Sequence, residues 1–137
     1  MHVFYLHGFA SSGHARKAAY FGERFRPHGI TLRCPDFNEP EFATLTMTRM
    51  LGQLARDIEP LDQQPIVLIG SSLGAAVAVH TAARLGPRID RLVLLAPALT
   101  FPKDAPSVLG AGAVERWRET GTLEVMHHGQ GGTRLVN

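Results

Sequence analysis

The pentapeptide Gly70-Ser71-Ser72-Leu73-Gly74 constrains the fold of this chain more than any other segment. It joins a short apolar run, residues 66–69, to an alanine-rich stretch, residues 73–85, so a G-x-S-x-G pattern falls where a strand is expected to turn into a helix. Gly70 and Gly74 permit a tight turn, which holds the serine oxygen above a helix N-terminus whose free N–H groups favour negative charge. We therefore expect Ser72 to be a catalytic nucleophile. The alternative is a chance match in a chain with 14 glycines.

The loop after the first apolar run is the second feature. Residues 2–6 read as a strand that leads directly into His7-Gly8-Phe9-Ala10-Ser11-Ser12-Gly13. In hydrolases with a nucleophile at a strand-to-helix turn, the N–H after the nucleophile and an N–H from the loop after an earlier strand form the oxyanion hole. Leu73 and Phe9 are the expected backbone donors, and losing one such donor costs ~2.7–4 kcal/mol. We expect the site to be shaped by His7, Gly8, Gly70 and Gly74, whereas an ordinary turn with a capping histidine is the alternative.

Strand and helix patterns alternate along the chain, which predicts a three-layer α/β/α fold with a mainly parallel sheet. The expected strands are His2–Leu6, Ile30–Arg33, Ile66–Ile69 and Ile89–Leu95. Apolar residues recur at helical spacing between the first two strands (Ala18, Phe21, Phe25) and between the next two (Met47, Met50, Leu51, Leu54, Ile58). Pro40 is a candidate for the start of that second helix. The first and third strands would place the His7 loop and Ser72 at the same, ligand-binding edge of the sheet.

The C-terminal part of the chain has weaker patterns. Residues 97–106 begin and end with proline and are expected to form a loop. A short helix is expected around Val114–Glu119, followed by a weak strand pattern at Leu123–Met126. The glycine-rich segment Gly129–Gly132 is expected to be mobile. At 137 residues, we expect one domain spanning residues 1–137.

Three segments together resemble the small YqiA-like esterases of the α/β-hydrolase superfamily. They are His7-Gly8-Phe9-Ala10-Ser11-Ser12, Gly70-Ser71-Ser72-Leu73-Gly74 and Leu94-Leu95-Ala96-Pro97-Ala98, and Trp117-Arg118-Glu119-Thr120-Gly121 adds softer support. The resemblance spans most of the chain. It implies a serine hydrolase that acts on small carboxylic esters or thioesters without a cofactor, with Ser72 as nucleophile and the backbone of Phe9 and Leu73 as the oxyanion hole.

The family's order of catalytic residues implies that this chain stops early. An acid and then a histidine follow the nucleophile, and both motifs would lie beyond Asn137. We therefore expect an α/β-hydrolase-like sheet that is incomplete on its C-terminal side, with the outer edge of Ile89–Leu95 unpaired and prone to self-association. Losing the histidine of a serine triad costs on the order of a millionfold in turnover, so we expect this chain to be nearly inactive.

Two alternatives remain open at this point. Asp104 with His127 or His128 has the order needed to complete a triad within the chain, although a triad is defined by geometry rather than order. The other alternative is a non-catalytic hydrolase-like module that binds a small acyl compound, because a fold alone does not determine function. Asp36 and Asn38 follow the second strand and lie near the expected site, but nothing in their pattern assigns them a role.

Composition excludes several other classes of function. The formal net charge is +2 and basic residues are scattered among acidic ones, so no nucleic-acid-binding patch is expected. One cysteine, Cys34, and histidines without ligand spacing predict no metal site and fit a reducing compartment. Residues 63–83 carry no formal charge, but their glycine-serine break argues against a membrane span. We expect a cytoplasmic location, because the N-terminus does not resemble a signal peptide.

Overall fold

Four parallel strands form the central sheet of the computed structural model, in the order β2-β1-β3-β4. They are β1 (His2–Leu6), β2 (Leu32–Arg33), β3 (Ile66–Ser71) and β4 (Ile89–Leu95). The structure describes the backbone of residues 1–137 and all side chains except those of Phe101, Pro102, Asp104 and Val108. The predicted parallel sheet is confirmed, although the second strand is shorter than the predicted Ile30–Arg33.

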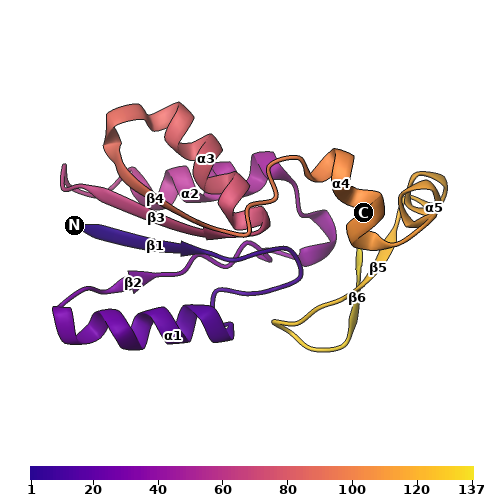
Figure 1. Ribbon diagram of the computed structural model, residues 1–137, viewed down its shortest axis with the longest axis horizontal. Helices are drawn as coiled ribbons and strands as arrows, with labels where there is room; N and C mark the ends of the chain where they lie inside the picture. Colours follow the sequence, from indigo (N-terminus) through magenta and orange to yellow (C-terminus); the bar gives the residue numbers. More distant parts are fainter.

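Helices cover both faces of the sheet, as predicted (Figure 1). Helix α1 (Arg16–Phe25) packs on the face that carries Val3 and Tyr5. Helices α2 (Met47–Ile58) and α3 (Leu73–Leu85) pack on the opposite face, against Phe4 and Leu6. Successive side chains of a strand point to opposite faces, so β1 contributes to both cores and reads as a continuous apolar run. The result is the three-layer α/β/α arrangement of an α/β-hydrolase fold.

Helix α2 begins at Met47, so the prediction that Pro40 opens this helix is wrong. The hydroxyl of Thr46 accepts a hydrogen bond from the backbone N–H of Arg49 at 3.1 Å and caps the helix N-terminus. Pro40 follows a cis peptide bond, and a single 3-10 turn, Phe42–Thr44, lies between it and the helix. Thr46 is therefore the residue that sets the start of α2.

The chain after β4 is more ordered than its sequence suggests. Helix α4 (Phe101–Leu109) occupies much of the predicted loop 97–106, because a proline in the first turn of a helix removes no intrahelical hydrogen bond. Helix α5 (Ala113–Thr120) and strand β5 (Leu123–Met126) were expected. Strand β6 (Thr133–Val136) was not, and it pairs antiparallel with β5, so Gly129–Gly132 lies in the connection of a hairpin rather than in a free tail. These elements lie beyond the carboxyl ends of the parallel strands (Figure 1).

Strand β4 is the outer strand of the described sheet, next to β3. Leu92 and Val93 in its middle are 38% and 42% exposed. None of the described helices combines the length and apolar character needed to cross a lipid bilayer. The position of β4 is the one expected from its place in the sequence.

Candidate active site

Ser72 has a backbone conformation that few non-glycine residues adopt. Its φ and ψ angles are 53° and −116°, at the point where β3 ends and α3 begins. Its N–H donates to the carbonyl of Leu95 at 2.9 Å, and its own carbonyl accepts from the N–H groups of Ala75 and Ala98 at 3.0 and 3.2 Å. Such a conformation costs about 1–3 kcal/mol and persists only where the surrounding structure enforces it. Here the neighbouring strand and the following helix hold the turn.

The two glycines around Ser72 are required by close backbone contacts. A Cβ atom on Gly70 would lie 2.4 Å from Cα of Ala75, and one on Gly74 would lie 2.1 Å from the carbonyl oxygen of Leu6. Backbone atoms form both contacts, so rotation of a side chain cannot relieve them. The structure thus explains the spacing of the G-x-S-x-G pattern as a consequence of α3 running close to the ends of β3 and β1.

The segment after β1 lies beside Ser72. A Cβ atom on Gly8 would be 3.3 Å from Cβ of Ser72 and 3.9 Å from its Oγ. Gly8, the residue before Phe9, therefore lies next to Ser72, with little room for a side chain between them. On the other side, Leu73 is the first residue of α3, so its N–H has no partner within the helix. The two predicted donors, Phe9 and Leu73, are thus each one residue after the neighbouring Gly8 and Ser72.

His7 holds the loop rather than the serine. Its Nδ1 lies 2.9 Å from the carbonyl oxygen of Gly8, and its Nε2 accepts a hydrogen bond from the N–H of Phe37 at 2.9 Å. With Nε2 accepting from Phe37, Nδ1 carries the hydrogen and donates to Gly8; Oδ1 of Asp36 also lies 3.2 Å from Nε2. Burial lowers the pKa of His7, partly offset by the Gly8 bond and by Asp36, which agrees with a neutral ring. Both ring nitrogens are occupied.

An apolar cavity of about 410 Å³ adjoins the turn. Phe9 and Leu73 line it together with Ala98, and the remaining wall is almost entirely apolar. The other lining residues are Leu45, Thr46, Met47, Met50, Ala76, His80, Leu99, Trp117 and Val136. No carboxylate, lysine or arginine is among them, so the cavity suits an uncharged apolar group.

The structure gives His127 partners other than Ser72. The ring is fully buried, its Nδ1 accepts from the N–H of Gln130 at 2.9 Å, and its Nε2 lies 3.2 Å from Oδ1 of Asn38. Burial, and to a lesser extent Arg134, lower the pKa of His127. His128 is exposed, and the side chain of Asp104 lies outside the described residues. His127 therefore has no free ring nitrogen with which to act as the histidine of a triad with Ser72 and Asp104.

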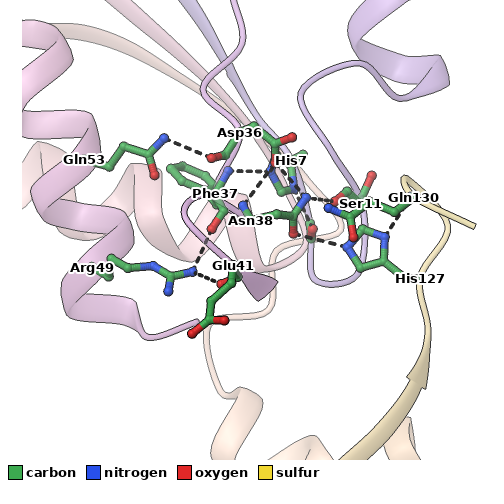
Figure 2. A network of polar contacts seen from close by, with 11 residues as sticks. His7, Ser11, Asp36, Phe37, Asn38, Glu41, Arg49, Gln53, His127 and Gln130 are labelled. Carbon is green, nitrogen blue, oxygen red and sulfur yellow. Dashed lines mark hydrogen bonds and ion pairs between the residues drawn. The ribbon is translucent and has the colours of Figure 1, made fainter. Parts of the chain in front are cut away.

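Asn38 and Asp36 lie closer to the site than their sequence pattern revealed (Figure 2). Asn38 is 3% exposed and hydrogen-bonds to the carbonyl of Ser11 in the loop after β1. The signal in the sequence was only their place after the second strand, at the ligand-binding edge of a parallel sheet.

Among the described residues, no three histidine, cysteine or acidic side chains are grouped closely enough to hold a metal ion.

Several solved structures with a similar fold are hydrolases or esterases. A putative hydrolase from Agrobacterium vitis S4 superposes with a TM-score of 0.73 at 21% identity, covering 98% of this chain and 56% of its own length. An extracellular α/β-hydrolase from a Paenibacillus species gives 0.69 at 17% identity, with 91% and 55% coverage. Polyneuridine aldehyde esterase gives 0.62 at 14% identity, with 98% and 57% coverage.

The chain thus spans little more than half the length of these solved structures, and the likeness establishes the α/β-hydrolase fold. No curated protein matches its sequence at a significant level. A family model does match, over residues 2–133, which include the loop after β1, the turn at Ser72 and strand β5 of the C-terminal hairpin. The chain belongs to the uncharacterised protein family UPF0227.

Proposed function

We propose that this protein is a serine hydrolase that cleaves a carboxylic ester or thioester, with Ser72 as its nucleophile. The observation that carries the proposal is the backbone of Ser72, held at a φ of 53° between a strand and a helix. Strain of this kind concentrates at functional sites, because a serine on an ordinary turn needs none of it. The close contacts at Gly70 and Gly74 show how completely the surroundings enforce it.

In the proposed reaction, Oγ of Ser72 attacks the carbonyl carbon and the carbonyl oxygen becomes an oxyanion. The backbone N–H groups of Phe9 and Leu73 would stabilise that charge, since Leu73 follows Ser72 and Phe9 follows Gly8, which lies beside Ser72. The Oγ proton passes to solvent water, the alkoxide or thiolate leaves and takes a proton from water, and a water molecule then hydrolyses the acyl-serine to the free acid and Ser72. The acyl group would occupy the apolar cavity next to Phe9 and Leu73. An esterase among the structural neighbours fits this substrate class.

The proton of Oγ needs an acceptor, and neither buried histidine is arranged to take it. All four ring nitrogens of His7 and His127 already have hydrogen-bond partners. The proposal therefore assigns these two rings no part in proton transfer. Attack on an ester with a good leaving group depends least on such a base, so acylation of Ser72 is the step that tests the proposal.

The experiment is hydrolysis of a short-chain nitrophenyl ester by the full chain. We expect nitrophenolate release that depends on Ser72, with a first turnover that approaches one product per chain. Ser72→Ala should abolish it, whereas Ser71→Ala should retain it, because Oγ of Ser71 contacts Lys17. Equal rates for the wild-type chain and Ser72→Ala would contradict the proposal and favour a module that only binds an acyl compound.

A further inference from the structure

Three carbonyl oxygens of the loop after β1 each accept a hydrogen bond that fixes the orientation of their peptide group. These are His7 Nδ1 to Gly8 at 2.9 Å, the N–H of His128 to Ala10 at 2.7 Å, and Nδ2 of Asn38 to Ser11 at 2.8 Å. The C=O and the following N–H of a trans peptide point in opposite directions. The Gly8 carbonyl therefore fixes the direction of the Phe9 N–H, and the Ala10 and Ser11 carbonyls fix those of the Ser11 and Ser12 N–H groups in the same loop.

Asn38 connects this loop to the C-terminal hairpin (Figure 2). Its Nδ2 donates to the carbonyl of Ser11 and to Oδ1 of Asp36, at 2.8 and 2.6 Å. Its Oδ1 faces Nε2 of His127 at 3.2 Å. Both N–H groups and the oxygen of the Asn38 amide are thus used within the protein, and of their partners only Asp36 and Ser11 are partly exposed. Such a fully satisfied network favours one arrangement of the chain.

His127 is suited to only one role in this network. Because its Nδ1 accepts from the N–H of Gln130, its Nε2 carries the hydrogen and donates to Asn38. The edge of its ring packs on Phe42, with centroids 4.7 Å apart, and Phe42 packs on Phe9 at 5.4 Å. The hairpin therefore reaches the loop by two routes, through hydrogen bonds to Ser11 and through aromatic contacts to Phe9.

The turn of the hairpin is also seated directly on the loop. A Cβ atom on Gly129 would lie 2.7 Å from the carbonyl carbon of Ser11 and 2.8 Å from the backbone nitrogen of Ser12. These are backbone contacts, so the two segments fit together only with glycine at this position. The close packing makes the distance between the hairpin and the loop sensitive to small changes.

We propose that Asn38 and His127 are positioning residues, which hold the loop after β1 so that the N–H of Phe9 points at the oxyanion formed on Ser72. The hairpin β5–β6 then acts as a support for the oxyanion hole from the far side of the loop. This inference rests on the proposed function, because the oxyanion exists only if Ser72 attacks an acyl group.

The variants that test it separate hydrogen bonding from packing. His127→Phe keeps a ring against Phe42 and removes the donor, whereas His127→Gln retains an N–H that can reach Asn38. Asn38→Leu removes both sides of the link. Gln53→Leu is the matched control, because Gln53 donates to the carbonyl of Asp36 at 3.0 Å from the other side and does not contact the loop after β1 in this network.

Two readouts are measured on each full-length variant: the backbone amide resonances and hydrogen exchange of Phe9 and Ser11, and the rate of Ser72 acylation by a nitrophenyl ester. We expect Asn38→Leu and His127→Phe to shift those resonances, speed exchange, and slow acylation by up to about 100-fold with little change in KM. His127→Gln should recover most of the acylation rate, and Gln53→Leu should match the wild-type chain.

Unchanged Phe9 and Ser11 amides in both Asn38→Leu and His127→Phe would overturn the inference. So would an acylation rate that falls equally in Gln53→Leu, because the effect would then follow general destabilisation. If Asn38→Leu does not fold, the two His127 variants decide the matter. Absence of acylation in the wild-type chain would contradict the proposed function alone, and the amide measurements would still show whether Asn38 and His127 hold the loop.

Discussion

Gly74 is the residue whose replacement should damage the site most for the smallest chemical change. In Gly74→Ala the new Cβ would lie 2.1 Å from the carbonyl oxygen of Leu6 and 2.6 Å from that of His7. Real Cβ contacts essentially never fall below 3.0 Å, so helix α3 must move away from β1 by most of an ångström. Overpacking that side chains can absorb costs ~1–3 kcal/mol. Here only backbone could yield, so we expect a loss of at least ~3 kcal/mol in the free energy of unfolding.

Gly22→Ala is the matched control, since a Cβ on Gly22 meets no atom within 4 Å. Gly22 lies inside α1, where alanine is favoured over glycine by roughly 0.5–1 kcal/mol. Urea denaturation should therefore move the midpoints of the two variants in opposite directions. A loss below about 1 kcal/mol for Gly74→Ala would refute the reasoning, because α3 could not then be packed against β1 as closely as the turn at Ser72 requires.

Three further outcomes are expected. Ser72→Gly should raise the free energy of unfolding by about 1 kcal/mol, since glycine adopts a positive φ without strain. The same substitution should abolish acylation. A lower free energy of unfolding would show that the serine is not strained. Burial lowers the pKa of His7 and His127, so the unfolded chain binds protons first as the pH falls. The free energy of unfolding should therefore be highest above about pH 6.5 and decline below it, and the decline should be shallower in His127→Gln. A flat profile of that free energy from about pH 7.5 to 5, measured by urea denaturation, would contradict this. Val93→Lys should reduce concentration-dependent association measured by light scattering, because Val93 is 42% exposed on the edge strand β4; association equal to that of the wild-type chain would place the contact elsewhere.

The sequence predicted the parts of the fold that follow from local patterns. The apolar runs at residues 2–6 and 66–69 correspond to β1 and to most of β3, because buried parallel strands are apolar on both faces. The glycine spacing around Ser72 predicted the turn, and the structure supplies its cause in the close contacts at Gly70 and Gly74. These features depend on residues that are near one another in the chain, so sequence periodicity and spacing detect them.

The hairpin and its network depend on contacts between distant segments, which local patterns do not contain. The pattern around His127 predicts a polar residue near the chain end. In the structure its ring is buried, hydrogen-bonded to Asn38, 89 residues earlier, and packed against Phe42. Helix α4 differs from the loop that its prolines predict, because one proline lies in the first turn and Pro106 is tolerated inside the helix. Asn38 itself carried no signal beyond its place after a strand.

The most direct test of the central claim is to locate the acyl group after the full chain reacts with a nitrophenyl ester. Mass spectrometry of the intact chain and of its peptides would show the adduct and the residue that carries it. We expect one acyl group per chain, on the peptide that contains Ser72, present in Ser71→Ala and lost in Ser72→Ala. An unmodified Ser72, or an adduct of equal yield on another residue in Ser72→Ala, would contradict the assignment of Ser72 as the nucleophile.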